Sequence, residues 1–305
     1  MTWKEEMVQS GSLRLYLVRN DIKKRPWILF LHGFPDDHTT WSAQMNTLSA
    51  RFNVATLDMR GVGRSDRPGR GKEYAVKEIL PDIQRVIEHI GAEKVHLVGH
   101  DWGSMIGWCF ATDPHYSRYL HSYTGIAAPH PGTILKFIGM KTLGLRWITL
   151  LEQLIRSWYI WFFQLPWLPE LLVSKASPSF WNRLLRRAQV QDDDPMLRRS
   201  QKDFESIARG PIHLYRQLIR RRPPRPALPQ IPCQQIIPDS DLFIATAVYD
   251  GQQKLFEGGP YRAVRIAGPH WVHRSDPDTV NEIILSMIPD TDKKKHKSKS
   301  AASVV

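Results

Sequence analysis

The sequence predicts an α/β fold built on a mainly parallel sheet, with one long helical insertion. Short apolar runs alternate with amphipathic helical segments between about residues 13 and 125, as is typical of parallel strands joined by helices. From about 131 to 228 this alternation stops, and the chain is rich in Trp, Leu and Arg at helical spacing. The alternation resumes at 231 and continues to 288. We therefore expect a core of residues 1–130 and 229–290, a helical cap of residues 131–228 over the carboxyl edge of the sheet, and a disordered basic tail of residues 291–305.

The first expected elements lie before the central strand-turn-helix segment. Residues 13–18 alternate apolar and polar side chains and predict a half-exposed strand, whereas residues 26–31 form an unbroken apolar run that predicts a covered central strand. Residues 54–57 predict another short strand. Isoleucine and valine side chains on one face of residues 79–90 predict a helix, and Pro81 should begin its regular part or kink it.

The remaining expected elements lie on both sides of the insertion. They are strands near residues 95–98, 120–125, 231–237 and 261–267, and helices near residues 105–112, 247–256 and 277–288. The sequence contains no internal repeat.

Length and composition are those of a folded globular protein. The 305 residues are 42% hydrophobic and 24% charged, which argues against disorder. Cys109 and Cys233 are too few for a disulfide framework, so we expect a reducing, cytoplasmic compartment. The N-terminus lacks the basic start and apolar run of a signal peptide. Residues 157–169, the best candidate for a membrane span, are too few and are interrupted by two prolines.

The formal net charge of +12 is concentrated in local runs. Five lysines lie between Lys293 and Lys299, and residues 220–226 form a run of arginine and proline. Such runs are usually solvated segments, and no nucleic-acid motif accompanies them. We therefore expect no nucleic-acid partner.

The stretch from Lys94 to Ser104 predicts a buried strand, an abrupt turn and a helix. The turn is Gly-His-Asp-Trp-Gly, and so sharp a turn leaves no room for side chains at Gly99 and Gly103. Asp101 is therefore forced out at the carboxyl end of the strand, where a nucleophile elbow has its serine. A carboxylate can displace a leaving group from a saturated carbon, and water then attacks the carbonyl of the ester formed on the enzyme.

Three further motifs accompany this turn: His32–Pro35 (H-G-x-P), Asp58–Asp66 (D-x-R-G-x-G-x-S-D) and Ala128–Pro131, which leads into the insertion. With them the chain resembles the α/β-hydrolase family, in the branch of soluble epoxide hydrolases and haloalkane dehalogenases. The resemblance runs from about Leu13 to Ile288 and implies an α/β-hydrolase fold with a mostly parallel eight-stranded sheet. Residues that depart from the branch's usual pattern without removing a reacting group are Val62, Ser104 and Pro269.

The family's chain order of nucleophile, acid and histidine implies a catalytic triad. Asp101 is the implied nucleophile. The acid falls in residues 238–243, where the resemblance favours Asp241 and Asp239 remains the alternative. The implied histidine is His270, which matches the family's Gly-His-Trp, although Pro269 precedes it here. Histidines expected to have structural, packing or surface roles are His32, His100 and His273.

Opening an epoxide creates an alkoxide that needs a proton or strong hydrogen bonds, whereas a halide departs without one. A phenol supplies both, because its pKa near 10 keeps the proton in place at neutral pH. The run Phe-Phe-Gln-x-Pro and a Tyr-Arg pair resemble epoxide-hydrolase cap motifs, which places the phenols at Tyr159 and Tyr215. The resemblance also implies oxyanion-binding backbone N–H groups at Phe34 and Trp102, and substrate contacts from Trp102, Phe163 and Trp271.

The resemblance implies hydrolysis of a small apolar epoxide to a vicinal diol, through an ester on Asp101 and without metal or organic cofactor. A dehalogenase with the same nucleophile is the first alternative, in which Trp102 would donate to the halide. A catalytically inactive hydrolase fold that binds an apolar ligand or a protein is the second. The sequence leaves open whether the chain forms a homodimer.

Overall fold

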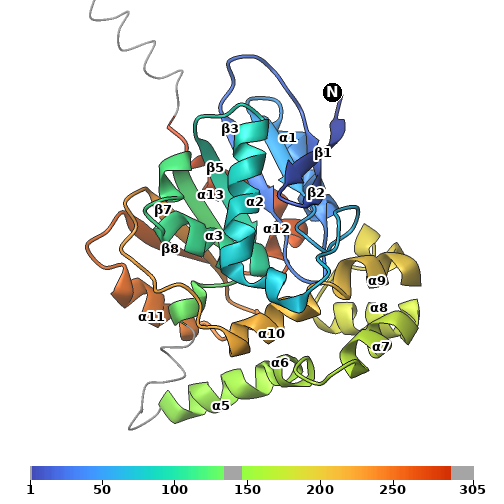
Figure 1. The fold of residues 1–305 in the computed structure, drawn as a ribbon. Coiled ribbons are helices and arrows are strands. Elements are labelled where there is room, and N and C mark those ends of the chain that lie inside the picture. Colours follow the sequence, from blue (N-terminus) through green and yellow to red (C-terminus); the bar gives the residue numbers. More distant parts are fainter. Residues whose placement is uncertain (1, 134–145, 290–305) are drawn as a thin grey trace, which may run out of the picture.

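The computed structural model describes residues 2–133 and 146–289. In this part of the chain eight strands form one sheet in the order β1-β2-β4-β3-β5-β6-β7-β8 (Figure 1). The pairs β1–β2 and β2–β4 are antiparallel, and the other neighbouring strands are parallel. The strands are β1 (Lys4–Ser10), β2 (Leu13–Arg19), β3 (Trp27–Leu31), β4 (Asn53–Leu57), β5 (Val95–His100), β6 (Leu120–Ile126), β7 (Cys233–Pro238) and β8 (Tyr261–Ile266). The predicted α/β-hydrolase sheet is confirmed.

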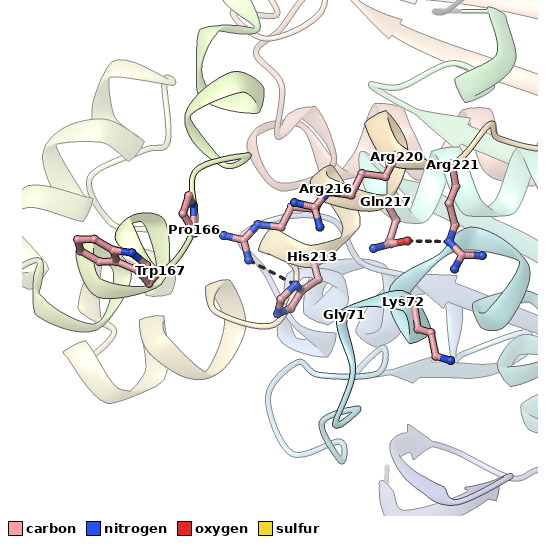
Figure 2. Close-up of a pocket in the computed structure, with 9 residues that line it drawn as sticks. All are labelled: Gly71, Lys72, Pro166, Trp167, His213, Arg216, Gln217, Arg220 and Arg221. Carbon is pink, nitrogen blue, oxygen red and sulfur yellow. Dashed lines mark hydrogen bonds between the residues drawn. The ribbon is translucent and has the colours of Figure 1, made fainter.

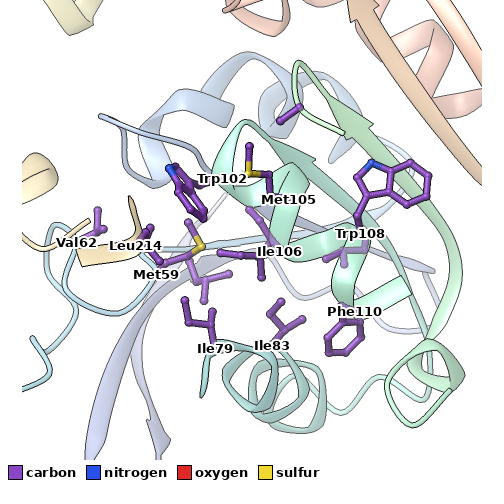
Figure 3. Close-up of a cluster of buried hydrophobic side chains, with 14 of the residues drawn as sticks. Met59, Val62, Ile79, Ile83, Trp102, Met105, Ile106, Trp108, Phe110 and Leu214 are labelled. Atoms are coloured by element: carbon purple, nitrogen blue, oxygen red, sulfur yellow. The ribbon is translucent and has the colours of Figure 1, made fainter. Parts of the chain in front are cut away.

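Helices cover both faces of the sheet, which explains why every residue of β3 and of β5 is buried. The helices flanking the sheet are α1 (Ser42–Leu48), α2 (Val76–His89), α3 (Trp102–Thr112), α11 (Val248–Leu255), α12 (Val272–Ser275) and α13 (Pro277–Leu285). One apolar core lies mainly against α2 and α3 and the other against α1 and α13. Figure 3 shows the first of these cores, in which Ile79 and Ile83 face Ile106. Short 3₁₀ helices occupy His38–Trp41, Gly71–Tyr74, Ser117–Tyr119 and Pro195–Arg198.

The described residues between β6 and β7 form helices and no strand, as the sequence predicts for the insertion. The helices are α5 (Arg146–Arg156), α6 (Trp158–Phe162), α7 (Leu168–Lys175), α8 (Pro178–Arg187), α9 (Gln201–Ala208) and α10 (Ile212–Arg220). Local signals in the sequence set several of their ends. Ser177 caps α8, and Ser200 and Asp203 form a capping box at the start of α9.

Ion pairs and apolar contacts join the insertion to the rest of the molecule. Arg199 pairs with Asp37 at 2.8 Å and with Asp36 at 3.3 Å. In a second ion pair the charges are exchanged: Arg274, outside the insertion, pairs with Asp194 of the insertion. Leu214 of α10 packs into the core beside α3 (Figure 3). The insertion is thus fixed to the carboxyl end of the sheet by charges and by shared core.

Two features differ from the sequence-based expectations. β1 was not expected, because its residues are mostly polar and only two of its side chains are buried at this sheet edge. The helix expected over residues 79–90 begins at Val76, so Pro81 lies inside α2 rather than at its start. The proline removes one hydrogen-bond donor there, and the many buried side chains of α2 keep the helix intact. The predicted basic tail, 291–305, lies outside the described residues.

None of the helices in the described ranges combines the length and apolar character needed to cross a bilayer.

Candidate active site

Four parallel strands deliver the candidate residues to one edge of the sheet. Phe34 follows β3, Asp101 follows β5, Asp241 follows β7 and His270 follows β8. The carboxyl ends of parallel strands meet at the same edge, which is where ligands bind in open α/β sheets. Within the described ranges, no group of three or more His, Cys, Asp or Glu side chains is arranged to hold a metal ion.

The turn after β5 has the geometry of a nucleophile elbow. Asp101 has φ +49° and ψ −115°, a conformation that L residues rarely adopt. The turn is held closed by hydrogen bonds from the Asp101 N–H to the Ile126 carbonyl at 3.0 Å and from the Met105 N–H to the Asp101 carbonyl at 2.9 Å. A Cβ on Gly99 would lie 2.2 Å from the Gly103 carbonyl oxygen, and a Cβ on Gly103 would lie 2.3 Å from the Leu31 carbonyl oxygen. Both glycines are therefore required by close backbone contacts, as the sequence indicated.

The two oxygens of the Asp101 carboxylate have different surroundings. Oδ2 accepts a hydrogen bond from the Phe34 N–H at 2.8 Å, whereas Oδ1 lies 3.8 Å from Nε2 of His270. Burial raises the pKa of Asp101; the His270 charge and the N–H groups of Phe34 and Trp102 offset part of this, and the net pKa stays above its ordinary value. The carboxylate thus has one oxygen bound by the Phe34 N–H and the other on the side of the histidine.

His270 is oriented by Asp241. Its Nδ1 lies 2.8 Å from Oδ2 of Asp241, whose Oδ1 accepts from the backbone N–H groups of Phe243 at 2.7 Å and Ile244 at 3.1 Å. Burial lowers the pKa of His270, but the carboxylates of Asp241 and Asp101 together more than offset this, so the net pKa is raised. Asp239 instead is exposed and accepts from the Gly268 N–H at 3.1 Å. The structure therefore brings Asp241, and not Asp239, to the histidine.

The other nearby histidines have backbone or packing contacts. His32 accepts from the Met59 N–H at 2.9 Å through Nε2, so its Nδ1 carries the proton and donates to the Gly33 carbonyl. His100 donates from Nε2 to the His270 carbonyl at 2.9 Å. His273 is fully buried and lies 2.7 Å from the Thr40 hydroxyl, which makes it a packing residue rather than a surface one.

The two predicted tyrosines come from different helices of the insertion and meet above Asp101. Tyr159 of α6 and Tyr215 of α10 have ring centroids 5.7 Å apart, and the Tyr215 ring lies 5.0 Å from Trp102. Burial raises the pKa of both phenols, and the negative charge of Asp101 adds to the effect. Both phenols therefore keep their protons at neutral pH.

Aromatic side chains enclose these groups. Phe163 lies 5.7 Å from Phe34 and 5.0 Å from Tyr215, between ring centroids. Trp271 packs beside His270 at 5.0 Å. Phe163 thus faces the same space as the tyrosines, whereas Trp271 supports the histidine from its flank.

Three residues that the sequence reasoning missed also contribute to the site. The Phe243 ring packs 4.8 Å from His270. Gln153 donates to the Phe243 carbonyl at 2.9 Å and accepts from the Ala245 N–H at 2.8 Å, and Arg156 donates to the Asp241 carbonyl. A signal for Gln153 and Arg156 exists in the sequence. They precede Tyr159 at intervals of three residues, a spacing that would place them on the same side of a helix as Tyr159.

The unusual residues in the family motifs fit the structure without disturbing these contacts. The Ser104 hydroxyl donates to the Ala128 carbonyl at 2.5 Å, and Val62 is buried in the core. Pro269 joins Gly268, which has φ +144°, to His270.

The comparison with a family of known sequences agrees with this geometry. A sequence model of the family described as alpha/beta hydrolase fold matches residues 26–222. The chain belongs to this family. Among curated proteins, this α/β-hydrolase is 28% identical over 293 residues to epoxide hydrolase 3 of Xenopus tropicalis, covering 93% of this chain and 77% of that protein. It is 26% identical to epoxide hydrolase 4 of Homo sapiens, and the match covers 94% of this chain and 79% of that protein.

A solved structure shares the fold of this α/β-hydrolase. The Bacillus megaterium epoxide hydrolase in complex with an inhibitor superposes with a TM-score of 0.77 at 24% identity, covering 93% of this chain and 99% of that chain.

The elbow glycine gives a direct test of the backbone argument. Replacing Gly99 with alanine should destabilise the protein by about 1–3 kcal/mol or more, because the added Cβ meets backbone rather than a movable side chain. The matched control is Gly251→Ala in α11, where a Cβ has open space and should stabilise by up to about 1 kcal/mol. Denaturant unfolding measures both values, and equal stabilities for the two variants would contradict the argument.

Proposed function

We propose that the chain is an epoxide hydrolase that converts an epoxide and water to a vicinal diol through an alkyl ester on Asp101. The observation that carries the proposal is the Asp101 carboxylate at the elbow, 3.8 Å from His270 and below the phenols of Tyr159 and Tyr215. The similarity to proteins named as epoxide hydrolases supports it.

In the first step, the substrate's epoxide oxygen binds between the two phenols. Oδ1 of Asp101 attacks a ring carbon from the opposite side, and the C–O bond of the epoxide breaks. The departing oxygen takes a proton from a phenol, which leaves a tyrosinate stabilised by its neighbours. Oδ2 becomes the ester carbonyl oxygen, already beside the Phe34 N–H at 2.8 Å.

In the second step, His270 acts as the base. Its Nε2 takes a proton from water, while Asp241 holds the ring and stabilises the imidazolium. The hydroxide attacks the ester carbonyl carbon, and the N–H groups of Phe34 and Trp102 hold the oxyanion. Collapse releases the diol and restores the carboxylate, and the proton on His270 returns to the tyrosinate.

The inserted helices form the cap in this proposal. Residues 131–228 supply both phenols and Phe163, so they close the site and set the shape of the apolar substrate. Trp102, Phe163 and Trp271 are the proposed substrate contacts. Of these, Phe163 has the best support, because its ring faces the phenols.

A dehalogenase is less well supported. A halide site needs weak donors such as indole N–H groups, whereas the two rings that face each other across this site, 5.7 Å apart, are those of the phenols Tyr159 and Tyr215. Two phenol O–H donors above Asp101 suit an alkoxide, which needs a proton, better than a halide, which does not. Release of halide from haloalkanes without activity on epoxides would establish the dehalogenase, and no turnover of either class would favour the inactive binding protein.

The compartment and the oligomeric state belong to the same proposal. Cys109 and Cys233 are free and buried, which supports a cytoplasmic enzyme. The homodimer stays a prediction that sedimentation equilibrium would test.

The His270→Gln variant tests the covalent intermediate. Without the base, ester formation continues but hydrolysis slows by about 10²–10⁴-fold, so the ester accumulates. Intact-protein mass spectrometry with excess epoxide should show an adduct of one substrate mass on His270→Gln and none on Asp101→Asn/His270→Gln. Persisting diol formation with no adduct in His270→Gln would refute the assignment.

The rate of ester hydrolysis should depend on pH through His270. The Asp241 carboxylate raises the pKa of His270. The base form of His270 is present only above its pKa, so the single-turnover rate of ester hydrolysis should fall at low pH, and this acidic limb of the pH profile reports the pKa of His270. In Asp241→Asn the charge that raises the pKa is gone, and the limb should move to lower pH as the maximal rate falls. A limb that does not move between the two proteins would contradict the pairing of His270 with Asp241.

The two phenols should act mainly in ring opening. Tyr159→Phe and Tyr215→Phe should each slow ester formation by about 10–100-fold, and the double variant by about 10³-fold or more. Stopped-flow measurement of the alkylation phase separates the rate of ester formation from the rate of ester hydrolysis. The control is Tyr116→Phe, a half-buried tyrosine outside the site, which should keep the wild-type rate. Full activity of the double variant would remove the phenols from the mechanism.

A further inference from the structure

The cap helices α5, α6 and α7 and the turns between them carry a series of exposed apolar side chains, called the stripe below. Exposed positions recur every three or four residues along α5, α6 and α7, among them Leu151, Ile155, Trp158, Trp161, Leu165 and Leu168. Leu151 and Ile155 are one helical turn apart in α5, and Trp158 and Trp161 are about one turn apart in α6, so each pair lies on one face of its helix. Figure 1 shows the three helices following one another along the lower edge of the molecule, below α10. Monomeric proteins rarely leave so long an apolar surface uncovered unless something binds there.

The opposite face of the same helices already serves the active site. The inward-facing residues contact the loop that follows β7 and the Phe34 ring beside Asp101. Gln153 of α5 and Tyr159 of α6 contact Phe243 of that loop, and the buried Phe163 contacts Phe34. The outer apolar residues therefore do not build the core of the cap.

Three tryptophans are the largest exposed groups of this stripe. Trp158, Trp161 and Trp167 are 64%, 57% and 69% exposed. Trp167 has φ +50° and precedes α7 (Figure 2). Tryptophan has an apolar body and a polar N–H, and it is enriched where lipid meets water.

Positively charged residues are common in the inserted segment that carries the stripe. Residues 131–228 contain seventeen Lys or Arg and seven Asp or Glu, so this segment holds most of the chain's net charge of +12. Beside Trp167 a cavity of about 720 Å³ is lined by Lys72, Arg216, Arg220 and Arg221 (Figure 2). Glu170 neutralises Arg216, so the other three cations give the cavity its positive charge.

Exposed tryptophans beside positive charge favour a lipid surface over a second copy of the chain as the binding partner. A second copy of the chain on the same face would bring two sets of cations together, which costs free energy. An anionic lipid surface instead supplies negative head groups to the cations and an apolar layer to the tryptophans.

We propose that the outer face of α5–α7 docks on an anionic lipid surface. Trp158, Trp161 and Trp167 enter the interface, and the cavity of Lys72, Arg220 and Arg221 takes an anionic lipid head group. α6 then lies between lipid and active site, with Trp158 and Trp161 on one side and Tyr159 on the other. This inference is independent of the reaction proposed for Asp101.

Vesicle flotation with the full chain tests the proposal. The chain should float with phosphatidylcholine vesicles that contain phosphatidylglycerol, much less with phosphatidylcholine alone, and less as salt increases. Trp158→Ser/Trp161→Ser and Arg220→Gln/Arg221→Gln should each weaken partitioning roughly tenfold or more. The lysine-rich tail is the same in every protein, so differences between variants report on the cap.

Matched controls lie at the other end of the molecule. Lys23→Gln/Lys94→Gln removes two exposed cations near the amino ends of the parallel strands, and Met7→Ser removes an exposed apolar side chain of β1. Both should float as the wild type does, with unchanged unfolding temperatures for all four variants.

Equal flotation of the cap variants and the wild type would overturn the proposal, as would absence of binding to anionic vesicles. Dimerisation in sedimentation that the tryptophan double variant abolishes, without vesicle binding, would assign the face to a second copy and also overturn it.

Discussion

The backbone of one residue, Asp101, is the constraint on which the rest of the site depends. A non-glycine residue at φ +49° costs about 1–3 kcal/mol, and the fold offsets this with contacts on both sides of the turn. The preceding strand and the following helix are fully buried, and Gly99 and Gly103 let their backbones meet. The strain is local, but it fixes the carboxylate between the Phe34 N–H and His270, where a relaxed turn would not hold it.

The inserted helices do more than cover this carboxylate. Gln153 and Arg156 hold the loop that follows β7, through the carbonyls of Phe243 and Asp241, and the next turn of the same face carries Tyr159. The position of the inserted helices and the orientation of Asp241 are therefore physically linked. A displacement of α5 would alter both the placement of Tyr159 and the partner of His270.

The sequence predicted the features that depend on local pattern. Apolar runs placed the parallel strands, and glycine spacing placed Asp101 at the elbow. The resemblance favoured Asp241, but the residues alone left Asp239 open, because the choice depends on where a turn of few residues directs each carboxylate. The sequence reasoning also missed Phe243 and Gln153, whose contacts join segments about 90 residues apart. The sequence did not predict β1, because this edge strand buries few side chains and so lacks an apolar pattern.

The origin of the oxygen in the first product tests the central claim most directly. One turnover of the wild-type protein in ¹⁸O-water, with enzyme in excess over epoxide, should place the label in the peptide that contains Asp101 and leave the diol unlabelled, because water attacks the carbonyl of that side chain. Label found in the diol, with none in the peptide, would mean that water attacks the epoxide directly, and would contradict an account in which Asp101 is the nucleophile.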